Sequence, residues 1–204
     1  MISHKYKCIF IHIPRCAGTS VEATIADDDW WKIDKGTKHI IAPTAKRIYK
    51  DYWDDYFKFT IIRNPWSRLV SMTRYSSFYK VRINKTNELM DISKYKSSFP
   101  NIEIDPRSVV QKNEIDFSIH QSLYQNIIGS EMDYIAKFEN IDEDLAFIYD
   151  KIKFSGKSKR FKCRTGRSDY DSLNYTKYYN PDIKEQVYQL YKNDIDKFNY
   201  KFGE

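Results

Sequence analysis

Residues 8–20, CIFIHIPRCAGTS, hold the pattern that decides the fold. Residues 8–13 are mostly β-branched or aromatic, and Pro14 ends this apolar run, which is typical of a buried strand that leads into a loop. Small residues follow at Ala17 and Gly18. The sequence therefore predicts a strand over 8–13 and, after it, a tight loop built from small side chains.

A helix is predicted directly after this loop. Thr19 is a capping type of residue, Glu22 follows three positions later, and the apolar residues Val21 and Ile25 are four positions apart. This arrangement matches a capping box at the start of a helix. We therefore expect Thr19 to cap a helix that runs to about residue 25.

The rest of the chain repeats the order of strand, polar loop and helix. A hydrophobic run at 56–62 ends in a turn at 63–65, and a third run at 133–138 also has strand character. Strands that alternate with helices favour parallel pairing in an α/β sheet that carries helices on both faces. The predicted helices cover residues 43–52, 66–79, 118–128, 142–152 and 181–198.

The chain length fits one domain. A chain of 204 residues is long enough for one continuous core and short for two full domains, so we predict a single domain over 1–204. Residues 81–116 are polar and irregular, and long segments of this kind in compact domains are usually functional or mobile.

The composition restricts the partners and the location. Lys and Arg number 34 and Asp and Glu 28, so the net charge is +6 and an anionic partner is favoured. The basic residues are dispersed among acidic ones, so no nucleic-acid-binding arm is indicated. The cysteines Cys8, Cys16 and Cys163 have no paired spacing that would indicate a disulfide framework or a zinc site. We find no signal peptide and no apolar stretch long enough to span a bilayer, and we expect a cytoplasmic protein.

The loop after the first strand has the features of an anion-binding cradle. Arg15 supplies a positive charge, Gly18 lets backbone amides approach a ligand, and the next helix points the positive end of its dipole at the loop. The Walker A loop of nucleotide triphosphatases, GxxxxGK[ST], is not matched, because no Lys follows Gly18. From these residues alone, an anion cradle and an ordinary helix cap stay equally open.

A second loop supports the anion-binding alternative. Arg63 follows the second predicted strand, and Arg68 and Ser71 lie three positions apart on the next predicted helix, where they are neighbours on its surface. A guanidinium group donates hydrogen bonds in pairs, which suits a phosphate. A basic, solvated helix is the alternative that these three residues leave open.

Together the two loops resemble those of the carbohydrate sulfotransferases. Residues 10–20, FIHIPRCAGTS, resemble the 5′-phosphosulfate loop of that family, H-x-P-K-T-x-G-T-S, and residues 63–71, RNPWSRLVS, resemble its 3′-phosphate motif, R-N-P-x-x-R-x-x-S. The likeness continues at residues 38–39, 138–140 and 194–202. It implies a P-loop-like three-layer α/β fold with a central parallel sheet flanked by helices. It also implies transfer of a sulfuryl group from 3′-phosphoadenosine 5′-phosphosulfate (PAPS).

The resemblance implies roles for the donor-binding residues. Arg15 would contact the bridging and sulfuryl oxygens of PAPS, although the family usually has Lys there and Thr in place of Cys16. An Arg keeps the positive charge but cannot hand over a proton at neutral pH, so the implied role is electrostatic. Arg63 and Ser71 would hold the 3′-phosphate. The other implied donor-binding positions are Cys16, Ala17, Gly18, Thr19 and Ser20 at the 5′-phosphate, Arg68 in the second motif, and Arg164 and Thr165 in a basic loop that closes over the nucleotide in similar enzymes.

The resemblance also describes the acceptor side. His39 would be the general base that removes the acceptor proton, since an imidazole titrates near neutrality. His12, within an apolar run, is expected to be a hydrogen-bonded structural histidine. The family implies a hydroxyl of a glycan or glycolipid as the acceptor, and we expect residues 81–116 to select it. No metal ion is expected, because Arg15 and the helix end supply the positive field. A P-loop kinase or nucleotide hydrolase, and a noncatalytic binder of nucleotides or anionic glycans, are the alternatives.

Overall fold

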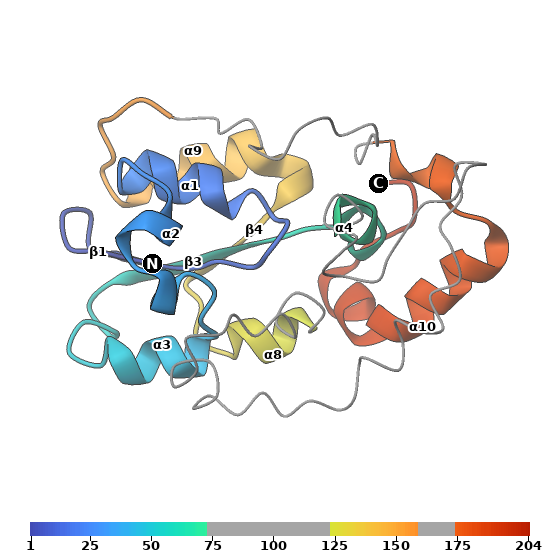
Figure 1. Cartoon of the computed structure of the whole chain (residues 1–204), viewed down its shortest axis with the longest axis horizontal. Helices are drawn as coiled ribbons and strands as arrows, with labels where there is room; N and C mark the ends of the chain where they lie inside the picture. Colours follow the sequence, from blue (N-terminus) through green and yellow to red (C-terminus); the bar gives the residue numbers. More distant parts are fainter. Residues whose placement is uncertain (73–122, 159–173) are drawn as a thin grey trace. The chain divides into compact units, whose positions relative to one another are not determined.

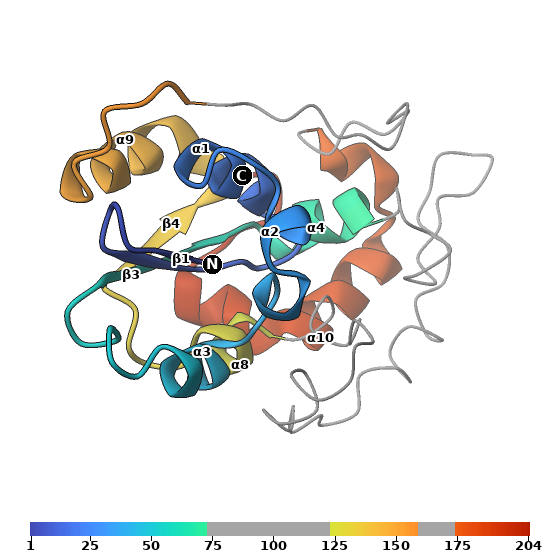
Figure 2. The ribbon, with the colours of Figure 1, turned by 60° about the vertical axis from the view of Figure 1, so that its left-hand side comes forward.

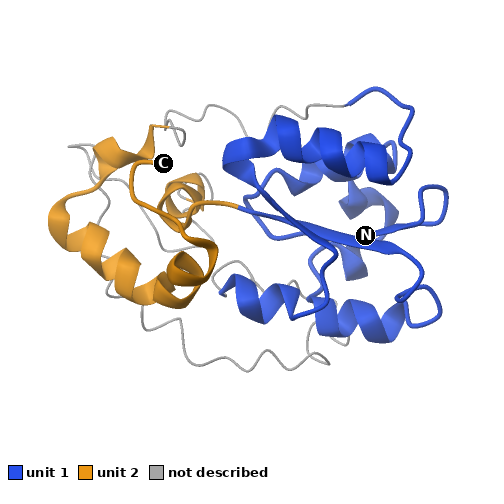
Figure 3. Ribbon diagram, turned by 180° about the vertical axis from the view of Figure 1, so that it is seen from behind, with its two compact units in different colours: residues 1–62, 103–162 blue, residues 63–102, 163–204 orange. Residues whose placement is uncertain are grey.

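The computed structural model describes residues 1–72, 123–158 and 174–204 (Figure 1). The chain divides into two compact units, residues 1–62 with 103–162 (unit 1) and residues 63–102 with 163–204 (unit 2) (Figure 3). Compact units of this kind can belong to one domain, so the single domain over 1–204 stays a prediction. The insert at 81–116 lies outside the described residues.

Unit 1 is built on a four-stranded sheet in the order β1-β2-β3-β4. The strands β2 (Cys8–Ile11), β3 (Phe57–Ile62) and β4 (Tyr134–Lys137) are parallel, and β1 (Ile2–Ser3) pairs antiparallel with β2. This confirms the predicted α/β sheet. The antiparallel edge was not predicted, because two residues carry no readable pattern.

Helices cover both faces of this sheet, as expected for a sheet of mostly parallel strands. The helices α1 (Gly18–Ile25) and α9 (Ile141–Lys151) lie on one face, and α3 (Ala42–Ile48) and α8 (Tyr124–Ile128) lie on the other (Figure 1, Figure 2). All four residues of β2 are buried. The result is the three-layer arrangement that the sequence predicts.

The predicted element boundaries differ from the observed ones at a few places. The strand predicted over 8–13 ends at Ile11, because His12 leaves the sheet to bond with a side chain of α1. The helix predicted over 43–52 ends at Ile48. The short helices α2 (Trp30–Ile33) and η1 (Lys35–Thr37) were not predicted, since they are too short to show a helical period.

Unit 2 contains α4 (Pro65–Met72), the 3-10 helix η5 (Tyr175–Tyr178) and α10 (Pro181–Phe198). Trp66 joins these elements. Its indole N–H donates to the backbone oxygen of Lys184 at 3.1 Å, and its own carbonyl accepts from the Tyr179 hydroxyl at 2.9 Å. The Phe202 ring packs against Trp66 at 5.5 Å between centroids. The tyrosine-rich C-terminal region therefore contributes core contacts to this unit.

Two further observations concern the predicted location. Cys8 and Cys16 are buried and form no disulfide, and Cys163 lies outside the described residues. Among the helices of residues 1–72, 123–158 and 174–204, none has the length and apolar character needed to cross a membrane. The cytoplasmic location stays a prediction.

Candidate active site

The loop between β2 and α1 has an unusual backbone. Arg15 and Ala17 have φ angles of 70° and 63°, in the left-handed region, and neither residue is a glycine. Such conformations cost about 1–3 kcal/mol each and are concentrated at functional sites. Left-handed residues are also the elements from which anion-binding backbone nests are made. The backbone of this loop therefore supports the predicted anion cradle.

The start of α1 is open to an anion. The N-cap of the helix is Ala17, which provides no side-chain hydrogen bond, and the first turn contains no acidic residue. The prediction that Thr19 caps the helix is wrong, because the helix already begins at Gly18 and Glu22 is drawn into a buried ion pair instead of a capping box. The positive end of an uncapped helix attracts phosphate and sulfate groups.

His12 packs directly against Gly18 at this helix start. A Cβ atom placed on Gly18 would lie 2.1 Å from Cδ2 and 2.3 Å from Nε2 of the imidazole. No side chain fits there without displacing His12. Gly18 therefore permits close packing of the His12 imidazole against the loop. This is a second role, beside the approach of backbone amides to a ligand that the sequence indicates.

Replacing Gly18 with Ala is expected to lower the free energy of unfolding by about 2 kcal/mol, because overpacking of this kind displaces buried side chains. Urea unfolding measures the loss. Gly36→Ala is the matched control, since a Cβ there meets its nearest atom, Oδ1 of Asp34, at 3.4 Å. Equal stability of the two variants would contradict the close packing of His12 on Gly18.

His39 lies next to His12 in unit 1. Its Nδ1 is 3.2 Å from the backbone oxygen of His12, and the two rings are 4.4 Å apart between centroids. A carbonyl oxygen only accepts hydrogen bonds, so Nδ1 of His39 carries the proton. In the neutral ring Nε2 is then unprotonated. This is the tautomer that a general base requires.

Both histidines are held in the neutral form. Burial lowers the pKa of His39 well below its usual range, and the neighbouring His12 lowers it further. Burial also lowers the pKa of His12, and Lys38 adds to this effect. A base with a lowered pKa is already deprotonated at neutral pH, so His39 needs no prior loss of a proton.

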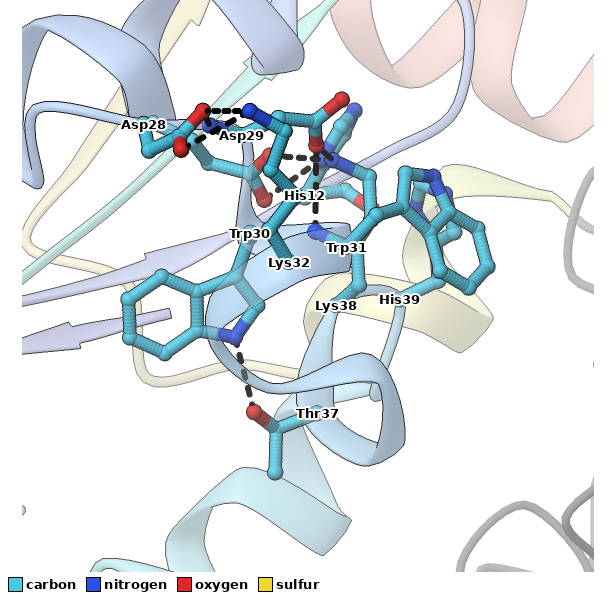
Figure 4. A network of polar contacts seen from close by, with 10 residues as sticks. His12, Asp28, Asp29, Trp30, Trp31, Lys32, Thr37, Lys38 and His39 are labelled. Carbon is cyan, nitrogen blue, oxygen red and sulfur yellow. Dashed lines mark hydrogen bonds and ion pairs between the residues drawn. The ribbon is translucent and has the colours of Figure 1, made fainter.

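A buried ion network includes His12 and the residue that precedes His39 (Figure 4). Oε1 of Glu22 is 2.8 Å from Nδ1 of His12, and Oε2 of Glu22 is 2.5 Å from Nζ of Lys38. Lys38 also donates to Oδ1 of Asp29 at 2.6 Å. Burial raises the pKa of Glu22, and the ammonium group of Lys38 opposes that shift. The network fixes Lys38, the residue that precedes His39 in the chain.

The second predicted loop is organised within unit 2. Asn64 accepts from the Trp66 amide at 3.2 Å and donates to the backbone oxygen of Lys201 at 2.9 Å, so the turn is tied to the C-terminal segment. Nε of Arg63 donates to Oγ of Ser67 at 2.8 Å. Arg68 and Ser71 are buried on α4. The predicted alternative of a solvated basic helix does not fit these buried side chains.

The comparison with known protein families decides the identity. The model described as the sulfotransferase family matches residues 1–201. The chain belongs to the sulfotransferase family. The comparisons of this chain with curated proteins and with solved structures found no match. It is therefore an enzyme that uses PAPS as its sulfuryl donor, and the resemblance of the two loops is confirmed at the level of the family.

The cradle of this sulfotransferase fits the anionic end of its donor. Two left-handed residues, an uncapped helix start and the guanidinium group of Arg15 meet in one loop of unit 1. Within the described parts of the chain, no group of three or more His, Cys, Asp or Glu residues could hold a metal ion. The absence of a metal requirement stays a prediction.

Some predicted site residues cannot be placed, and some network residues were not predicted. Arg164 and Thr165 lie outside the described residues, and Glu139 is exposed in the 3-10 helix η4 (Phe138–Asn140). His12 is hydrogen-bonded as expected. Sequence reasoning missed Glu22 and Asp29, because the spacing that marks a capping box gives no sign of a long-range ion pair.

Proposed function

We propose that this sulfotransferase transfers the sulfuryl group of PAPS to a hydroxyl of a glycan or glycolipid and releases 3′-phosphoadenosine 5′-phosphate. The tautomer of His39 carries the proposal for a hydroxyl acceptor, because an imidazole that is protonated at Nδ1 and unprotonated at Nε2 can accept a hydroxyl proton at Nε2. The carbohydrate nature of the acceptor is supported by the two motifs, which resemble those of carbohydrate sulfotransferases.

In this proposal the loop of unit 1 binds the 5′-phosphosulfate. Amides and hydroxyls of residues 16–20 hold the 5′-phosphate, and Arg15 holds the bridging and sulfuryl oxygens. Arg63 and Ser71 hold the 3′-phosphate, with Arg68 in the same motif, and Arg164 and Thr165 contact the nucleotide. The left-handed φ angles of Arg15 and Ala17 support the first assignment, and the sequence motif supports the others.

The reaction proceeds as an in-line displacement. The acceptor oxygen forms a bond to sulfur while the bond between sulfur and the bridging oxygen breaks. The acceptor proton passes to Nε2 of His39, and the electron pair of the broken bond stays on the phosphate of the leaving nucleotide. Arg15 stabilises the negative charge that develops there, and fixed charges of this kind often supply the largest part of catalysis.

An acceptor panel tests the proposal. The protein is incubated with radiolabelled PAPS and unsulfated oligosaccharides, a glycolipid, an acyclic polyol and a phenol, with EDTA present. We expect label on sugar hydroxyls, an equimolar release of 3′-phosphoadenosine 5′-phosphate, and no effect of EDTA. PAPS should raise the melting temperature more than ATP does, because ATP lacks the 3′-phosphate.

Three other results would contradict part or all of the proposal. Label on the phenol or polyol alone would exclude a carbohydrate acceptor and leave the sulfotransferase activity intact. A requirement for magnesium with hydrolysis of ATP would favour the alternative of a kinase or nucleotide hydrolase. Donor binding with no transfer to any class of acceptor would favour a noncatalytic binder.

A further inference from the structure

One tryptophan of this chain differs from the other three. Trp30 donates its indole N–H to Oγ1 of Thr37 at 2.9 Å, and Trp53 donates to Oε2 of Glu131 at 2.8 Å. Trp66 donates to the carbonyl of Lys184 at 3.1 Å. The indole N–H of Trp31 has no acceptor in the part of the chain that the structure describes. Tryptophan N–H groups usually find a partner when buried, so an unused donor on a half-buried ring suits a ligand.

Trp31 lies beside the proposed base. Its ring is 5.6 Å from that of His39 between centroids, at an interplanar angle of 75° (Figure 4). Nζ of Lys38 lies 5.6 Å from the centroid of the indole. An acceptor hydroxyl must come within about 2.6–3.2 Å of the base that takes its proton. The group that carries this hydroxyl is therefore brought within reach of the indole.

The buried ion network also holds Trp31 in place. Oδ1 of Asp29 accepts both from the backbone amide of Trp31, at 3.1 Å, and from Nζ of Lys38, at 2.6 Å. One carboxylate oxygen thus joins the helix that carries the indole to the segment that carries His39. This bond fixes the backbone that carries the indole, and a site that is ordered before binding loses less conformational entropy when a ligand binds.

We propose that Trp31 is an acceptor-binding residue, with its ring stacked on a pyranose ring and its N–H donating to a hydroxyl or ether oxygen of that sugar. The inference rests on the proposed carbohydrate acceptor and adds the residue that recognises it. A sugar offers both apolar C–H groups on the ring face and oxygen acceptors at the rim. A straight-chain alcohol has no ring face to stack.

The test uses the full chain and the best oligosaccharide from the acceptor panel. Trp31→Ala is expected to raise the KM for the oligosaccharide roughly tenfold, and Trp31→Phe about threefold, because Phe keeps the stacking surface without the donor. The Kd for 3′-phosphoadenosine 5′-phosphate should stay within about twofold. Trp53→Phe is the matched control, since it also removes an indole N–H, but one that is bonded to Glu131. This control should leave the acceptor KM unchanged.

The outcomes separate this inference from the proposed function. Sulfation of sugars with an unchanged KM in both Trp31 variants would overturn the role of Trp31 and leave the carbohydrate acceptor standing. Sulfation of phenol or polyol hydroxyls alone would overturn both. Equal losses in acceptor KM and nucleotide affinity would also contradict the inference, because a general loss of structure affects both ligands.

Discussion

Replacing His39 with Ala is expected to lower kcat by about 10²–10⁴-fold, because the reaction then loses its general base. The structure supports the proposed role as base, since Nδ1 of His39 is 3.2 Å from a carbonyl oxygen and carries the proton, which leaves Nε2 unprotonated in the neutral ring. Steady-state turnover with labelled PAPS measures the loss. The affinity for 3′-phosphoadenosine 5′-phosphate should change by less than about twofold, because the proposed base contacts the acceptor.

Arg63→Ala is the contrasting variant in the same experiment. Loss of a charged hydrogen-bond donor from the proposed 3′-phosphate site should weaken nucleotide binding by roughly 10–100-fold, as calorimetry can measure. A mutant that loses binding and one that loses turnover are thereby distinguished. If both substitutions weakened nucleotide binding equally, the separate roles of His39 and Arg63 would be wrong.

The pH profile provides an independent check on the base. A general base works only when deprotonated, so kcat/KM falls as the pH drops through its pKa. Burial and the neighbouring His12 hold the pKa of His39 well below 6.5. Activity should therefore be flat through pH 6.5 and decline only in more acidic solution. A decline centred near pH 6.5 or above would show that His39 is not held in the neutral form.

The sequence predicts the order of elements in unit 1 because its parallel strands are buried on both faces. The run at 57–62 has four apolar residues of six and Pro65 follows it, so strand and turn are both visible. The loop predicted at 14–18 is also visible in the sequence, because Pro14 cannot continue a strand and the small residues Ala17 and Gly18 follow it. These are local signals that depend on a few neighbouring residues.

The rest of the site depends on contacts that local patterns do not record. Glu22 and Lys38 are 16 positions apart in the sequence, and α2 lies between them in the chain. Trp31 belongs to a helix of four residues and Asp29 is its N-cap, and a helix of this length is too short for a hydrophobic period. Sequence reasoning thus predicts the loop proposed to bind the donor but not the ion network next to His39, the proposed base.

Replacing Glu22 with Gln is expected to lower the free energy of unfolding by about 3–5 kcal/mol, because it removes one partner of a buried ion pair. Glu22 has 0% and Lys38 1% relative exposure, so water cannot replace the lost carboxylate. The two carboxylate oxygens accept from His12 and from Lys38. A Gln side chain has a single acceptor oxygen, so it can replace only one of these bonds. Urea unfolding measures the loss.

Asp28→Asn is the control for this substitution, because it breaks an ion pair with Lys32 in which the side chains are 42% and 50% exposed. Exposed pairs contribute about 0–1 kcal/mol, so the control should be close to the wild type in stability. A double variant decides whether the pair is the cause. Lys38→Met added to Glu22→Gln removes the ammonium group that has lost one of its two carboxylate partners and keeps only Asp29, and the combined loss should be smaller than the sum of the single losses. Additive losses would show that Glu22 stabilises the fold independently of Lys38, and the network could then not be the device that holds His39 in position.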